Sequence, residues 1–137
     1  MHNKSHIQGM VMMIMAGIMM LMMAFSSLAA TGWVKANDNW YYYYPDGTMA
    51  TGLIHVDDTY YYLKEDGTMV TGWLKIDNNY YYMRGDGSLG TGWRFMDNSW
   101  YYFDPASGIC LIDTSAEIDG RWYRCGSDGR MLTGRQR

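Results

Sequence analysis

The sequence predicts an all-β fold, a solenoid of stacked β-hairpins built from about five 20-residue repeats that follow an N-terminal signal helix. Three observations lead to this prediction: a recurring Thr-Gly-Trp motif, an aromatic triplet at a fixed distance after it, and an Asp-Gly pair near the end of most units. Aromatic residues favour strands and glycine favours tight turns. The 6 Trp, 13 Tyr and 16 Gly of this 137-residue chain are therefore typical of short strands joined by turns.

Residues 1–30 have the pattern of a secretory signal peptide. Lys4 lies in a polar start, residues 10–25 are apolar apart from one glycine, and small residues follow. Sixteen helical residues span about 24 Å, which is less than the ~30 Å hydrocarbon core of a bilayer. We expect cleavage after Ala29, with cleavage after Ala30 as a nearly equal alternative, and a secreted module over residues 31–137. An uncleaved membrane anchor is the alternative.

A 20-residue period runs through the rest of the chain. Thr-Gly-Trp begins at Thr31, Thr71 and Thr91, and Thr51-Gly52-Leu53 keeps the same spacing. A fixed spacing of this length is the signature of a repeat protein. The last unit is degenerate, as terminal repeats often are, because one of its faces meets solvent. The units lie near residues 31–50, 51–70, 71–90, 91–110 and 111–134.

Each unit is predicted to form one hairpin. In the first, a strand from Trp33 and a strand from Trp40 flank Asn37-Asp38, two residues that tolerate the positive φ angles of a hairpin turn. With the turn centred there, Trp33 lies opposite Tyr42, and alternation of side chains places Trp33, Trp40 and Tyr42 on one face. Isolated hairpins are marginally stable in water, so we expect them to stack face to back. Tyr61 of the next unit then meets the Trp33 face.

The repeat resembles the choline-binding, or cell-wall-binding, repeat of Gram-positive surface proteins and phage lysins. The resemblance covers about residues 31–134 and lies in the pattern T-G-W-x-K, a short turn, an aromatic triplet and D-G-x-M. It implies a left-handed β-solenoid with choline sites between successive repeats. Each site uses two strand aromatics of one unit and the middle Tyr of the next. Sugar-binding repeats of glucosyltransferases and of large clostridial toxins share the hairpin and its spacing, so a glucan is the alternative ligand.

Carried over residue by residue, the resemblance implies four ligand-binding clusters. The first is Trp33, Trp40 and Tyr61, the third is Trp73, Tyr80 and Tyr101, and the fourth is Trp93, Trp100 and Tyr123. The second, formed by Leu53, Tyr60 and Tyr81, is expected to be a weak site because leucine has no π face. Met49 or Met69 is expected to help close a cluster.

Such clusters suit a quaternary ammonium, which cannot donate a hydrogen bond and is held by ring faces worth about 0.5–2 kcal/mol each. Three rings give roughly millimolar affinity per site. Several sites facing one polymer bind more tightly through avidity. A sugar would stack its C–H face on the same rings and use nearby polar groups, for which the sequence offers Asn37, Asn39, Asn78 and Asn98.

Other features bound the remaining functions. The net charge of −3 provides no basic field for nucleic acid. Nucleophile–base spacings and calcium-loop patterns are missing from the sequence, so we expect no enzymatic activity, no metal site and no cofactor. Cys110 and Cys125 form an even pair in a chain expected to be exported, and a disulfide and two free thiols are both open.

The sequence therefore predicts a non-catalytic module that binds choline groups of a cell-wall polymer and is retained non-covalently at the cell surface. It predicts no membrane contact after signal cleavage and leaves the oligomeric state open. Two other functions remain: glucan binding by the same aromatic repeats, and a protein-binding adhesin or scaffold.

Overall fold

The computed structural model describes residues 30–132, which form ten strands and no helix. The all-β prediction is confirmed for this range. No element within these residues has the length and apolar character of a membrane-crossing helix. The predicted signal peptide, with its helix and its cleavage site after Ala29, lies outside the described residues.

The strands pair as five separate two-stranded antiparallel sheets, one for each repeat. Five residues make up every strand, and two residues separate the strands of each hairpin. In chain order the strands are β1 (Gly32–Ala36) and β2 (Asn39–Tyr43), β3 (Gly52–Val56) and β4 (Thr59–Leu63), β5 (Gly72–Ile76) and β6 (Asn79–Met83), β7 (Gly92–Met96) and β8 (Ser99–Phe103), and β9 (Thr114–Ile118) and β10 (Arg121–Cys125).

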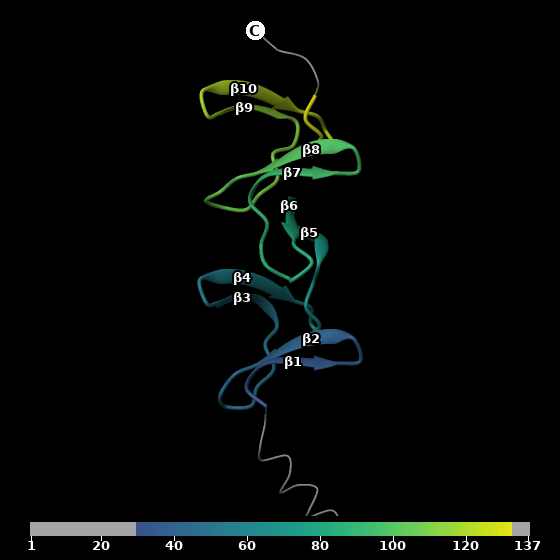
Figure 1. Cartoon of the computed structure of the whole chain (residues 1–137), viewed down its shortest axis with the longest axis vertical. Coiled ribbons are helices and arrows are strands. Elements are labelled where there is room, and N and C mark those ends of the chain that lie inside the picture. The colour runs from purple at the N-terminus through teal and green to yellow at the C-terminus, as the bar shows by residue number, and fades with distance from the viewer. Residues whose placement is uncertain (1–29, 133–137) are drawn as a thin grey trace, which may run out of the picture.

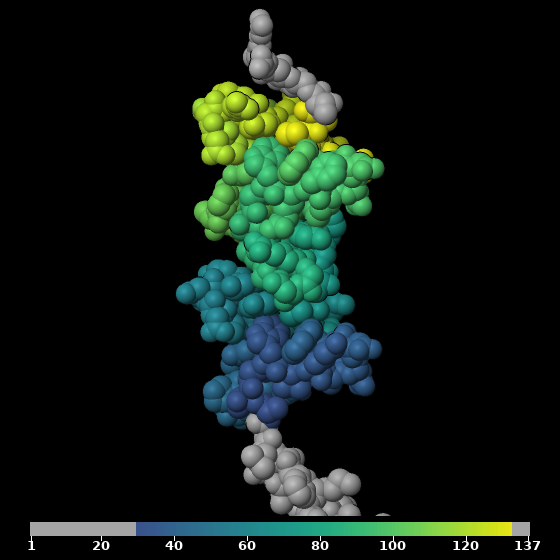
Figure 2. All heavy atoms as spheres, in the orientation of Figure 1, coloured from purple at the N-terminus to yellow at the C-terminus, as the bar shows by residue number. Residues whose placement is uncertain are grey.

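The hairpins are stacked along one axis in chain order (Figure 1). The hairpin β1–β2 points to the same side of the stack as β7–β8, and β3–β4 points to the same side as β9–β10. The direction therefore repeats after three hairpins. Seen as spheres, the hairpins project as lobes from a narrow column (Figure 2).

The register of the first hairpin is the predicted one. Trp33 pairs with Tyr42 and Lys35 pairs with Trp40. The turn residues Asn37 and Asp38 have φ angles of 49° and 62°, as a two-residue hairpin turn of type I′ requires. The fifth hairpin turns at Asp119-Gly120, with φ angles of 50° and 75°. Asp-Gly is a strong hairpin signal, and it explains why the degenerate last unit keeps the fold.

A second turn follows each hairpin and depends on an aspartate. The Asp46 carboxylate accepts hydrogen bonds from the Thr48 backbone N–H at 2.9 Å and from the Thr48 hydroxyl at 2.7 Å. Because these bonds stabilise the ionised carboxylate, they lower the pKa of Asp46 below its ordinary value. The fourth unit has one extra residue, and there Asp104 accepts the backbone N–H of Ser107 at 2.8 Å.

The core is an axial column rather than a central mass. The last residue of the second strand is buried in four units, and these residues are Leu63, Met83, Phe103 and Cys125. Each forms an isolated bridge with a residue beyond the following turn, as Leu63 does with Met69. The Met69 backbone N–H then donates to the Trp40 carbonyl of the preceding unit at 2.8 Å. Each unit is thus stabilised by its neighbours along the chain.

Glycine at the second turn meets two requirements at once. Gly87 has a φ of 85°, a conformation that favours glycine. The Met69 side chain of the preceding unit also lies against it, so that a Cβ at Gly87 would stand 2.6 Å from the Met69 Cε. Met49 lies against Gly67 in the same way.

Replacing Gly87 by alanine is therefore expected to destabilise the protein by about 1–2 kcal/mol from backbone strain alone, with the methionine clash adding to it. Urea denaturation followed by circular dichroism measures this. Gly85 provides the control, because a Cβ there meets nothing within 4 Å and its φ is not positive. Gly85→Ala is expected to change stability by less than about 0.5 kcal/mol. Equal denaturation midpoints for the two variants would show that neither the positive φ nor the Met69 contact requires glycine at position 87.

The two cysteines are free, buried thiols, which is the second of the alternatives left open by the sequence. Cys110 occupies the position at which Met49 and Met69 contact the glycine of the next unit. Its Sγ would lie 3.2 Å from a Cβ on Gly129. Burial raises the pKa of the Cys110 thiol to about 11. The thiol is therefore neutral at physiological pH and packs as a small apolar group.

Candidate ligand-binding clusters

Face-to-back stacking brings aromatic rings of successive hairpins into contact at three places. In each, the Trp of a first strand meets the middle Tyr of the next hairpin, edge to face and in nearly constant geometry. The ring centroids are 4.7 Å apart for Trp33 and Tyr61, 5.0 Å for Trp73 and Tyr101, and 4.8 Å for Trp93 and Tyr123. The predicted pairing between neighbouring units is therefore present in the structure.

In the first cluster, Trp33 lies between two tyrosines. Tyr42 of the same hairpin meets it at 5.1 Å and an interplanar angle of 71°, and Tyr61 of the next hairpin meets it at 63°. Trp40 lies on the same hairpin face and is exposed. The cluster therefore has a packed inner part around Trp33 and an open indole at Trp40.

A methionine lies beside this first cluster. Met69 packs against the same buried apolar group as Trp33 and Tyr61, and its backbone is hydrogen bonded to Trp40. Of the two methionines expected to close a cluster, Met69 is thus the one at this position. Met49 lies against Gly67, as Met69 lies against Gly87.

In the fourth cluster, all three predicted residues are aromatic rings, and Trp93 contacts both of the others. Trp93 and Trp100 lie with centroids 6.3 Å apart and their planes at 89°, and Tyr123 meets Trp93 at 65°. Trp100 is 43% exposed. The residue opposite Tyr123 is Ala116, and Tyr123 itself is half-buried. Two perpendicular indoles and a phenol thus form a corner with one side facing solvent.

The second cluster has no indole. Leu53 is 60% exposed and occupies the position that Trp33, Trp73 and Trp93 hold in other units. Tyr60 packs at 4.5 Å against the His55 ring. With a leucine in place of the central ring, the cluster offers fewer π faces than the others.

Next to Tyr60, an open hollow of about 330 Å³ is lined by polar side chains that include Asp58, Thr59, Arg84 and Thr91. Pro105 and Ala106, from the turn that carries the extra residue, close its far side. This hollow could not be predicted from the repeat pattern. Its lining comes from three units, whereas the repeat pattern predicts contacts between adjacent units only.

The third cluster differs from the first and fourth in burial. Trp73 is exposed, but Tyr101 is only 6% exposed and belongs to a buried group with Phe103 and Cys110. The Lys75 ammonium already lies 5.3 Å from the centroid of the Tyr80 ring. The three predicted residues are near one another, but two of the rings are in contact with other parts of the chain.

The polar groups near the clusters belong to turns. Asn39 donates a side-chain hydrogen bond to the Asn37 carbonyl at 3.1 Å, at the tip of the first hairpin. Within residues 30–132, no three His, Cys, Asp or Glu side chains gather as a metal site would require. The groups that the clusters offer to a ligand are therefore mainly the faces of aromatic rings.

The repeats match a known family along the chain. The family model for the choline-binding repeat matches residues 30–71, 50–91 and 70–115. The chain belongs to the choline-binding repeat family. A model for a cell wall binding repeat matches residues 116–131, in the degenerate choline-binding repeat at the end. No curated protein matches the chain.

Solved structures of choline-binding proteins have a similar fold. CbpJ from Streptococcus pneumoniae is 36% identical, with a TM-score of 0.72 over 75% of this chain and 35% of its own. CbpF from the same species, determined in the presence of a peptidoglycan analogue, is also 36% identical, with a TM-score of 0.72 over 75% of this chain and 34% of its own. The choline-binding domain of pneumococcal CbpL is 27% identical, with a TM-score of 0.59 over 75% of this chain and 56% of its own. The chain thus spans about a third of the length of CbpJ and CbpF.

Proposed function

We propose that this protein is a non-catalytic module that binds choline groups of a cell-wall polymer in aromatic clusters between successive hairpins. The first and fourth clusters are assigned as the binding sites. The observation that supports this most directly is the corner formed by Trp93, Trp100 and Tyr123, with the repeated Trp33–Tyr61 contact as its counterpart. The family assignment favours choline over other guests of an aromatic corner.

The chemistry of the corner fits a trimethylammonium group. Its methyl groups carry the positive charge and offer no hydrogen-bond donor, so polar groups cannot hold it by hydrogen bonds. Ring faces attract it by about 0.5–2 kcal/mol each. With the rings edge to face and their centroids near 5 Å apart, a cation in the angle between the two rings would contact both faces at once. A third ring at a right angle, such as Trp100, adds another.

Export and surface retention complete the proposal. The signal peptide expected at residues 1–30 would deliver the module outside the cell, and the hairpin solenoid would then hold to the wall polymer without a covalent link. A weak individual site is sufficient for this, because a polymer presents many choline groups.

Binding of a sugar chain is the second candidate, favoured by the hollow beside Tyr60. This hollow combines an exposed phenol ring with the polar side chains of Asp58, Arg84 and Thr91. Aromatic stacking together with a few polar groups is how binding sites usually fix a polar ligand.

Titration of intrinsic tryptophan fluorescence separates these functions. Choline is expected to give a saturable change with a midpoint of about a millimolar, while glucose oligomers give none. Ethanolamine is the matched control, since it carries the same charge without the methyl groups and is expected to bind much more weakly. Saturation by glucose oligomers without a response to choline would select the sugar function. No response to either ligand would leave a protein-binding role.

A further inference from the structure

The third cluster lacks the open ring that a choline site needs. Tyr101 is 6% exposed, whereas Tyr61 and Tyr123, at the same position in the first and fourth clusters, are half-buried. A cation–π contact requires the cation to approach a ring face. The reason for the burial of Tyr101 lies in the fifth unit, outside the two hairpins that form the cluster.

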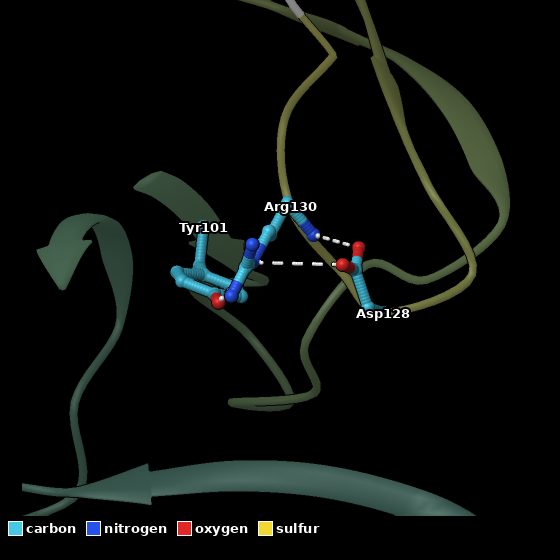
Figure 3. Close-up of polar contacts among 3 residues, drawn as sticks. All are labelled: Tyr101, Asp128 and Arg130. Carbon is cyan, nitrogen blue, oxygen red and sulfur yellow. Dashed lines mark hydrogen bonds and ion pairs between the residues drawn. The ribbon is translucent and has the colours of Figure 1, made fainter. Parts of the chain in front are cut away.

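The turn of the fifth unit lies on Tyr101 and places a guanidinium on its hydroxyl. Arg130 Nε donates to the Tyr101 hydroxyl oxygen at 3.3 Å (Figure 3). Asp128 holds the arginine in place, with one carboxylate oxygen 3.5 Å from Nε and the other accepting the Arg130 backbone N–H at 3.0 Å. A Cβ on Gly129 would stand 3.5 Å from the Tyr101 ring. The earlier units have Thr48, Thr68 and Ser88 at the Arg130 position.

A second arginine is the strand partner of Tyr101. Arg94 pairs with Tyr101 across β7 and β8, at a position held by Ile54 and Leu74 in earlier units. Its guanidinium lies over Gly90, where a Cβ would be 2.6 Å from Nε. The Nε atom is buried and has no hydrogen-bond partner among the described residues.

These arginines act against a cationic guest. Asp128 balances much of the charge on Arg130, the buried Nε of Arg94 has no hydrogen-bond partner among the described residues, and Lys75 already covers the Tyr80 ring. Like charges that lie near each other repel, and solvent reduces this repulsion less in a partly buried site than at an open surface. A quaternary ammonium entering the third cluster would meet a covered phenol and the chain's own cations.

We propose that the third cluster is closed to quaternary ammonium groups by Arg94 and Arg130, and that the protein binds choline at two sites only, the first and fourth clusters. This inference rests on the proposed function. The hairpins that carry these two clusters, β1–β2 and β7–β8, point to the same side of the stack (Figure 1). The two sites are therefore suited to one polymer chain that runs along the axis.

Choline titration of the protein followed by NMR of the tryptophan indole N–H groups tests the proposal. The signals of Trp33, Trp40, Trp93 and Trp100 are expected to shift with a total stoichiometry of two. The Trp73 signal stays at its position, as does that of Trp122, whose exposed ring belongs to no cluster. A Trp73 shift that saturates together with that of Trp33, or a stoichiometry of three, would overturn the proposal. If no indole responds to choline, it is the proposed function that fails.

The role of the arginines is tested by the double variant Arg94→Leu/Arg130→Thr, which restores residue types found in earlier units. The Trp73 indole is expected to respond to choline in this variant and the stoichiometry to rise to three. The control is Arg124→Thr, which removes an exposed arginine from the hairpin face opposite to Tyr123. In this variant the Trp73 indole signal is expected not to shift with choline. If circular dichroism shows that the double variant keeps the hairpin fold and its Trp73 signal still does not shift with choline, these arginines are not what closes the third cluster.

Discussion

Replacing Trp33 and Trp93 together by alanine is expected to abolish retention of the protein on a choline-substituted matrix. Each indole is the ring that joins two hairpins within its cluster, and each contacts a Tyr of the next unit within 5 Å. Loss of one ring removes about 0.5–2 kcal/mol of cation–π attraction. The two clusters act together on a polymer, so the avidity gain of about 10²–10⁴ is lost as well.

The two single variants separate affinity from avidity. Trp33→Ala and Trp93→Ala each leave one intact cluster, so binding of free choline is expected to remain with half the stoichiometry. Retention on the polymer falls for both, because one site alone holds with roughly millimolar affinity. Retention is measured by the concentration of free choline that elutes the protein. If one single variant eluted like the unaltered protein and the other lost retention, one cluster would account for all the binding.

A matched control distinguishes loss of a site from loss of an exposed aromatic ring. Trp122 is 62% exposed and contributes to none of the clusters, so Trp122→Ala is expected to elute with the unaltered protein. Trp33→Phe and Trp93→Phe keep a π face and are expected to recover part of the retention. Circular dichroism of each variant establishes that the hairpins are retained.

Contacts between adjacent repeats could be predicted from the sequence because they follow from two periods. These are the two-residue alternation of side chains along a strand and the 20-residue repeat. The Asn37-Asp38 turn fixes the register of its hairpin, and side-chain alternation then determines which face Trp33 occupies. Stacking brings this face to Tyr61. The same reasoning gives the Trp93–Tyr123 contact, although its second partner lies in a degenerate unit.

The closure of the third cluster could not be predicted in that way. It depends on Arg130, which lies two units beyond Trp73 and reaches back to Tyr101. A 20-residue period predicts what successive units share, and Arg94 and Arg130 are departures from it. Both are visible in the sequence once the repeats are aligned. Their effect follows only from the distances between side chains, which a pattern does not contain.

Phe103→Ala is expected to have the largest effect on stability of any single substitution considered for this chain. The Phe103 side chain is 0% exposed, and its ring lies 5.5 Å from that of Trp73 and 6.2 Å from that of Tyr82. Truncation of a buried phenylalanine costs about 3–5 kcal/mol, since it removes apolar contacts and leaves a cavity. That loss is a large fraction of the total stability of a typical domain, about 5–15 kcal/mol.

The location of the damage is as informative as its size. Phe103 belongs to the buried group with Tyr101 and Cys110 in the C-terminal half of the stack, whereas Ala50, Ile54 and Leu63 form a separate group in the N-terminal half. Repeat units interact mainly with their neighbours, so the hairpins from β5 onward are expected to unfold at lower urea concentration than β1–β4. Amide hydrogen exchange by residue measures this difference.

Phe95 supplies the control, because it is the same residue type on the facing strand β7 but is 57% exposed. Phe95→Ala removes only a surface contact with Trp100 and is expected to cost about 0.5–1 kcal/mol. If both phenylalanine variants lowered stability equally, the axial column would not be the core. If Phe103→Ala lowered exchange protection equally in all five hairpins, the stack would unfold as one cooperative body. Contacts between neighbouring hairpins would then couple the stability of the whole stack, and the first and fourth clusters would depend on the same core.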